Sequence, residues 1–106
     1  MRKKYNIVIA KAAEDDLDGI WNYISVDSIK NATNFITEIE ERIYSLENYP
    51  LRNPLIPENE ILGSKYRHLI YKDYRIIYRI KNYSVYILRI LHGSRLFEKD
   101  VIEESI

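Results

Sequence analysis

The sequence predicts an α+β fold with the element order β-α-α-β-β-β, in which a helical hairpin packs on one face of an antiparallel sheet. Three observations predict it. Residues 65–96 alternate as three strands joined by two-residue turns. Residues 12–24 and 29–47 repeat apolar side chains at helical spacing. A short run rich in β-branched residues, 5–9, opens the chain as a further strand.

The first helix is predicted over residues 12–24 because its apolar residues recur three or four positions apart: Leu17, Ile20, Trp21 and Ile24. Three carboxylates, Glu14, Asp15 and Asp16, fall in its first turn, where they interact favourably with the helix dipole on a solvated face. We expect Trp21 to lie in the core between the helices and the sheet.

The second helix is predicted over residues 29–47, with Asp27 or Ser28 as its N-cap. Its apolar stripe consists of Ile29, Ala32, Phe35, Ile36, Ile39, Ile43 and Leu46. The short connection between the two helices makes them antiparallel neighbours. Three prolines within residues 50–57 end the second helix, and a loop to Gly63 leads into the sheet.

The 106 residues fit one domain, with a core over 1–97 and an acidic tail over 98–106. The chain has no cysteine, which excludes disulfides and thiolate metal sites. No apolar run approaches the roughly 20 residues that span a bilayer, and no signal-peptide pattern opens the sequence. We therefore expect a cytoplasmic protein without a membrane partner.

The net charge of zero hides an uneven distribution. Residues 63–97 carry 8 Lys/Arg and a single acidic residue, Asp73, whereas residues 1–62 carry 7 Lys/Arg and 11 Asp/Glu. A basic sheet beside acidic helices favours a polyanionic or acidic partner. The alternative is that these charges pair with one another across the fold.

Arginines among apolar and aromatic residues are the candidate binding groups of the sheet: Arg67, Arg75, Arg79, Arg89 and Arg95. Guanidinium groups bind phosphate and carboxylate bidentately, and the tyrosines of the sheet can stack on bases, although such rings are more often part of a core. Arg75 is the strongest candidate because an arginine in a central strand needs an acidic partner or solvent. His68 is interpreted as structural. His92, at a strand end before Gly93, is open between a structural and a functional role.

The sequence contains no motif for phosphate-loop, metal-dependent or serine-nucleophile chemistry. The three glycines are scattered, so no phosphate-binding loop is present, and the two histidines lack metal-ligand spacing. No serine lies in a nucleophile-elbow motif. We therefore predict neither a cofactor nor a metal site.

The segments YRHLIYKDYRIIYRI and VYILRILHGSR resemble the RelE/ParE superfamily of bacterial type II toxin–antitoxin toxins. The helical segments DLDGIWNYI and ATNFITEIEERIYSLENYP resemble the hairpin of the same family, so the resemblance covers residues 5–97. It implies a compact toxin that a cognate antitoxin holds inactive by wrapping across the sheet and the helices. The charge distribution leads us to expect acidic and apolar side chains on the antitoxin segment that docks near Arg75.

Two activities occur in that family. RelE-like members cleave messenger RNA on the ribosome with basic sheet residues, to which Arg67, Arg75 and Arg95 correspond by resemblance. Such a metal-independent endoribonuclease would use Arg75 and Arg95 to hold phosphate and His92 for acid–base chemistry. Leu69 departs from this pattern where RelE-like toxins carry a lysine, and no tyrosine follows Arg95.

ParE-like members instead inhibit DNA gyrase and need no such catalytic set. The long hairpin and the ending Leu-His-Gly-Ser-Arg, residues 91–95, are more similar to ParE. We therefore expect a ParE-like gyrase inhibitor, with the ribosome-dependent mRNA endonuclease as the alternative and a non-toxic binding module as a further one. Whether the chain is an enzyme stays open at this point.

Overall fold

The structure is a computed structural model that describes residues 4–93 and 95. The predicted α+β class and element order are confirmed, with two short helical segments added between the second helix and the second strand. The predicted tail, 98–106, lies outside the described residues.

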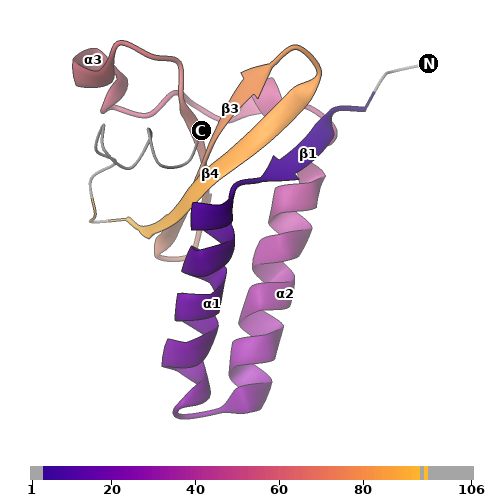
Figure 1. Ribbon diagram of the computed structural model, residues 1–106, viewed down its shortest axis with the longest axis vertical. Helices are drawn as coiled ribbons and strands as arrows, with labels where there is room; N and C mark the ends of the chain where they lie inside the picture. The colour runs from indigo at the N-terminus through magenta and orange to yellow at the C-terminus, as the bar shows by residue number, and fades with distance from the viewer. Residues whose placement is uncertain (1–3, 94, 96–106) are drawn as a thin grey trace.

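The sheet has four strands in the order β1-β4-β3-β2 (Figure 1). Their bounds are Asn6–Ile9 for β1, Arg67–Tyr71 for β2, Tyr74–Lys81 for β3 and Ser84–His92 for β4. Strands β2, β3 and β4 are antiparallel as predicted, but β1 pairs with β4 in parallel, so the sheet is mixed. No local signal fixes the direction of β1, because the whole intervening chain rather than a turn connects it to its partner.

Both predicted two-residue turns are present. Each begins with a residue in the left-handed region, Lys72 at φ 50° and Asn82 at φ 57°. At the far end of β4, the backbone N–H of Gly93 donates to the carbonyl oxygen of Asp73 at 2.7 Å. A Cβ on Gly93 would lie 3.3 Å from that oxygen, which explains the small residue at the strand end.

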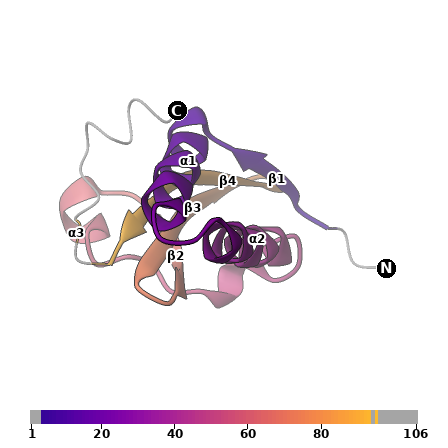
Figure 2. The same cartoon turned by 90° about the horizontal axis from the view of Figure 1, so that it is seen from below.

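The helices α1 (Lys11–Ser25) and α2 (Ile29–Ser45) form the predicted antiparallel hairpin and lie side by side (Figures 1 and 2). Ser28 caps α2, since its hydroxyl accepts a hydrogen bond from the N–H of Asn31 at 3.1 Å. The apolar stripes of both helices and one sheet face enclose the first core, which consists of Ala13, Ile20, Ile39, Ile43, Leu46, Leu69, Tyr71, Ile76, Tyr78, Val85, Ile87 and Ile90.

The far end of the hairpin continues beyond the sheet (Figure 1), and two expectations fail there. Trp21 is only half-buried and is not part of the first core; its indole N–H contacts the Thr33 hydroxyl at 3.4 Å between the two helices. Ile29, predicted within the buried stripe, is 66% exposed. Helical periodicity gives the direction in which a side chain points, but it does not show how far the opposing layer extends.

The second sheet face is covered rather than free. The chain after α2 passes through the 3-10 turn η1 (Pro50–Arg52) and the short helix α3 (Asn59–Leu62), which lies apart from the hairpin in Figure 2. Residues of this segment and of the sheet form the second core: Ile56, Tyr66, Ile77, Leu88 and Leu91. The Asn59 side chain fastens the segment by hydrogen bonds to both backbone groups of Tyr66, at 2.9 and 3.1 Å.

Candidate functional site

Arg75, the strongest sequence candidate, is held inside the protein. Its side chain leaves β3 on the second sheet face and is bidentate to Glu58, with N–O distances of 3.1 and 2.6 Å. It also donates to the backbone carbonyl of Arg95 at 2.7 Å. The residue is 6% exposed. The acidic partner that an arginine in a central strand needs is therefore Glu58 of the same chain, and Arg75 joins the central strand to the segment before α3. That Arg75 also binds an external partner stays a prediction.

Arg89 on β4, like Arg75 on β3, binds a carboxylate of the same chain. Its Nε and terminal nitrogen bind the two carboxylate oxygens of Asp16 at 2.7 and 2.9 Å, and the N–H of Ile90 donates to the same carboxylate at 2.8 Å. Asp16 was expected on a solvated face with Glu14 and Asp15, but its side chain is only 14% exposed. This carboxylate fastens α1 to β4.

The remaining predicted arginines differ in availability. Arg67 is committed to the fold, because it donates to the carbonyl oxygens of Leu51 and Asn53 at 3.3 and 2.6 Å. Arg79 is half-buried, with its guanidinium 5.6 Å from the centre of the Tyr86 ring. Arg95 is exposed. Arg79 and Arg95 are the members of the predicted set that an external anion reaches most readily.

His92 does not share a site with the Arg75 side chain. Tyr74 and His92 are directly paired across β3 and β4, and their rings are 5.6 Å apart in an edge-to-face arrangement. Paired residues project from the same sheet face, and neighbours along a strand project from opposite faces. Because Arg75 follows Tyr74, its guanidinium and the His92 imidazole lie on opposite sides of the sheet.

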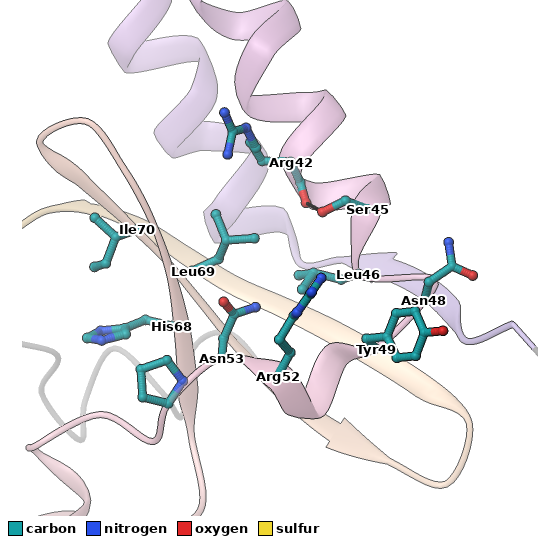
Figure 3. Close-up of a pocket in the computed structure, with 11 residues that line it drawn as sticks. Arg42, Ser45, Leu46, Asn48, Tyr49, Arg52, Asn53, His68, Leu69 and Ile70 are labelled. Carbon is teal, nitrogen blue, oxygen red and sulfur yellow. Dashed lines mark hydrogen bonds between the residues drawn. The ribbon is translucent and has the colours of Figure 1, made fainter.

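A pocket that the sequence did not predict lies between the end of α2, the η1 turn and β2 (Figure 3). Its volume is about 650 Å³. In the view of Figure 3, Arg42 on α2 lies above Leu69, and Arg52 rises from η1 and overlaps Leu46. The complete lining consists of Arg42, Ser45, Leu46, Asn48, Tyr49, Arg52, Asn53, Pro54, His68, Leu69 and Ile70. We call it the Arg42–Arg52 pocket.

The Arg42–Arg52 pocket is electropositive. No Asp or Glu is among its lining residues. Arg42 packs over the Tyr71 ring at 5.2 Å and Arg52 over the Tyr49 ring at 5.8 Å, and neither forms an ion pair within the described part of the chain. Burial and the nearby Arg75 lower the pKa of His68, so its imidazole is neutral at pH 7. Two guanidinium groups therefore dominate the charge of the pocket.

Local backbone geometry explains why Arg52 reaches this pocket. Tyr49 adopts a left-handed conformation at φ 43°, which turns the chain sharply after α2, and the buried Pro50 starts the 3-10 turn. Tyr78, a residue of the first core, stabilises this turn through its hydroxyl. The hydroxyl donates to the carbonyl of Pro50 and accepts from the Asn53 amide at 3.2 Å. The clustered prolines were the sequence signal for an ordered turn, although they gave no sign of a pocket.

The groups that line the pocket are suited to binding an anion. Within residues 4–93 and 95, no cluster of three or more His, Cys, Asp or Glu side chains could hold a metal ion. None of the described helices is both long and apolar enough to cross a bilayer. The pocket offers guanidinium and amide N–H groups, which bind anions, and its one imidazole has an unpartnered, buried Nδ1.

Comparison with solved structures shows the same fold in two toxin–antitoxin systems. One match is the chromosomal ParDE system of P. aeruginosa, with a TM-score of 0.69, 19% identity, and coverage of 86% of this chain and 98% of that chain. Another is the toxin–antitoxin complex RelBE2 of Mycobacterium tuberculosis, with a TM-score of 0.63, 23% identity, and coverage of 87% and 94%. The architecture is thus that of RelE/ParE toxins.

The family follows from the sequence itself. The model of the ParE toxin of the type II toxin–antitoxin system parDE matches residues 7–97. The chain therefore belongs to the ParE toxin family of type II toxin–antitoxin systems, within the RelE/ParE superfamily. A comparison with curated protein sequences finds no significant match.

Proposed function

We propose that this chain is a cytoplasmic toxin that inhibits DNA gyrase and is held inactive by a cognate antitoxin. One observation carries the preference for gyrase over messenger RNA cleavage. Two of the three groups that would serve an endonuclease are separated, because Arg75 is bound to Glu58 and the His92 ring projects from the other face of the sheet. Acid–base chemistry and phosphate binding must converge on one phosphodiester, and the side chains of Arg75 and His92 do not converge in this arrangement.

Two further observations support the proposal. The matching family model is that of ParE rather than RelE. Leu69 lies in the first core, where the RelE-like pattern has a lysine on the strand. An inhibitor that acts by binding needs no convergent catalytic set, which is compatible with the separation of Arg75 and His92. Arg79 and Arg95 are the arginines of the predicted set that we propose as target contacts.

Two assays on the purified wild-type protein test this function. In the first, gyrase supercoils relaxed plasmid in the presence of increasing toxin, with and without antitoxin. In the second, the same toxin preparation is incubated with programmed ribosomes, and the messenger is examined for cleavage at codon positions. We expect loss of supercoiling that the antitoxin reverses, and an intact messenger. Efficient ribosome-dependent cleavage with unimpaired supercoiling would reverse the assignment. No effect in either assay would indicate a non-toxic binding module.

A further inference from the structure

The Arg42–Arg52 pocket contains anion-binding groups that the fold itself does not use. Arg67, Arg75 and Arg89 of the sheet, by contrast, donate to carbonyl or carboxylate oxygens of the protein itself. Arg42 and Arg52 instead stack on tyrosine rings at the rim of an open pocket, and within the described residues no carboxylate reaches them. Aromatic stacking leaves the N–H edges of a guanidinium available for a bidentate acceptor.

The pocket walls combine apolar and polar surface. Leu46 and Leu69 belong to the first core and form a rigid apolar wall, beside which Ile70 is 54% exposed. Asn48, Asn53 and Tyr49 add side chains that donate hydrogen bonds. A ligand that matches this lining has an acidic group for the arginines and apolar surface for the leucines and Ile70.

The surrounding charges distinguish a peptide from a nucleic acid. The helix that carries Arg42 also exposes Glu38, Glu40 and Glu41, and the chain as a whole has zero net charge. A nucleic acid carries a charge at every phosphate and would meet these carboxylates next to the arginines. A polypeptide with one or two isolated acidic side chains satisfies both arginines without that repulsion.

We infer that the Arg42–Arg52 pocket receives acidic side chains of the neutralising antitoxin, flanked by apolar residues that pack on Leu46, Leu69 and Ile70. This inference rests on the proposed function for the identity of the partner. It moves the expected acidic contact from Arg75, which Glu58 already satisfies, to two arginines at the junction of α2, η1 and β2.

The test compares two double variants that remove the same total charge. Arg42→Ala/Arg52→Ala empties the pocket, whereas Lys30→Ala/Lys81→Ala removes two exposed cations that do not line it. The probe is the protein encoded by the reading frame adjacent to this gene, and titration calorimetry at low and high salt gives its affinity for each toxin. Circular dichroism and thermal unfolding confirm that each variant is folded.

We expect the arginine variant to bind about 10-fold or more weakly per arginine removed, as for a lost charge-assisted hydrogen bond. Its affinity should also depend less on salt than that of the wild type. Arg42→Lys/Arg52→Lys should restore only part of the affinity, because lysine cannot reproduce the bidentate geometry. If the arginine variant fails to fold, the lysine replacement and changes in the arginine Nε–H NMR signals of the wild type on antitoxin binding provide the test.

The outcomes separate the two proposals. If the wild type binds the antitoxin and the arginine variant binds as tightly as the Lys30/Lys81 control, the pocket inference is overturned and the proposed function stands. If the wild type does not bind the neighbouring protein at all, the function and the inference both fail. A labelled DNA duplex is titrated in parallel, and binding of DNA that is lost only in the arginine variant would overturn the inference in favour of a nucleic acid.

Discussion

Arg75 and Glu58 form an ion pair whose side chains are only 8% and 11% exposed. Removal of one partner leaves the other charge buried without compensation, which typically costs about 3–5 kcal/mol. We therefore predict that Arg75→Ala lowers the free energy of unfolding by this amount in urea denaturation. The pair replacement Arg75→Met/Glu58→Leu should cost less than Arg75→Ala alone, because no isolated charge remains.

The matched control is Arg79→Ala on the same strand, where the side chain is half-buried and stacks on Tyr86. We expect this change to cost about 1 kcal/mol or less, which is the upper range for an exposed cation–π contact. Equal destabilisation by Arg75→Ala and Arg79→Ala would show that the Arg75–Glu58 pair contributes nothing specific to stability.

We expect His68 to make the stability of the protein depend on pH, with a sign set by the direction in which its pKa is shifted. Burial is the main cause that lowers its pKa below the ordinary 6.5, followed by the nearby Arg75, while Glu58 acts in the opposite direction. The unfolded chain therefore takes up a proton before the folded protein does as the pH falls. Stability attributed to His68 is fully present above pH 6.5 and is lost below it.

We predict that the free energy of unfolding of the wild type declines as the pH falls below about 6.5, by at most about 1.4 kcal/mol per pH unit from this group. His68→Gln should flatten this part of the curve, measured by urea denaturation across the range. His92→Gln, which changes an exposed histidine, is the control and should retain the decline. An unchanged slope in His68→Gln would assign the pH dependence to other groups.

At the scale of elements, the hairpin divides into a part that lies on the sheet and a part that extends beyond it (Figure 1). Ile39 is fully buried in the first core, whereas Trp21 is half-buried between the helices. Truncation of a fully buried tryptophan usually costs about 3–5 kcal/mol, and we expect a smaller loss at Trp21 because its side chain is only half-buried. We predict that Trp21→Ala costs about 1–3 kcal/mol, less than Ile39→Ala at about 2–5 kcal/mol.

Urea denaturation of both variants measures this difference. Trp21 is the single tryptophan of the chain, so its fluorescence follows the unfolding of Ile39→Ala, and circular dichroism follows both. A larger loss in Trp21→Ala than in Ile39→Ala would mean that the far end of the hairpin is packed more tightly than its exposure indicates.

Local sequence patterns were sufficient to predict the helices and strands, but they did not predict the ion pairs of the arginines or the Arg42–Arg52 pocket. Helical periodicity, strand alternation and two-residue turns depend on neighbours in sequence, and they predicted both long helices and the β2–β4 meander. Arg75 meets Glu58 across 17 positions and Arg89 meets Asp16 across 73, which no local pattern encodes. The Arg42–Arg52 pocket likewise joins a helix end, a turn and an edge strand, and its shape exists only once these elements have packed.

At the scale of the whole molecule, some cations of the basic sheet pair with carboxylates of the acidic segments. The sequence left open whether their charges pair internally, and for Arg75 and Arg89 they do, with Glu58 and Asp16. These two ion pairs fix the segment before α3 and the helix α1 to opposite faces of one sheet. A scaffold fastened on both faces presents its remaining cations in defined positions, which suits recognition of a protein partner.

The last prediction concerns His92 and separates the two activities of the superfamily. In a nuclease, loss of the proton-transfer group would reduce the rate about 100- to 10,000-fold. Here His92 is exposed, packs edge-to-face on Tyr74 and lies across the sheet from the Arg75 side chain. We predict that His92→Gln lowers stability by about 0.5–1.5 kcal/mol, the usual worth of an aromatic pair, and leaves inhibition of gyrase per folded molecule close to that of the wild type.

Thermal unfolding and the supercoiling assay on the same preparation give both quantities, with Tyr74→Phe as a control that keeps the ring contact. Equal gyrase inhibition by wild type and His92→Gln at matched folded concentration agrees with a binding mechanism. If His92→Gln remains folded and still binds the antitoxin, yet loses its toxicity together with cleavage of ribosome-bound messenger, His92 is catalytic. The sheet would then have to rearrange on the ribosome to bring His92 and the Arg75 guanidinium to one face, or Arg95 rather than Arg75 would bind the phosphate.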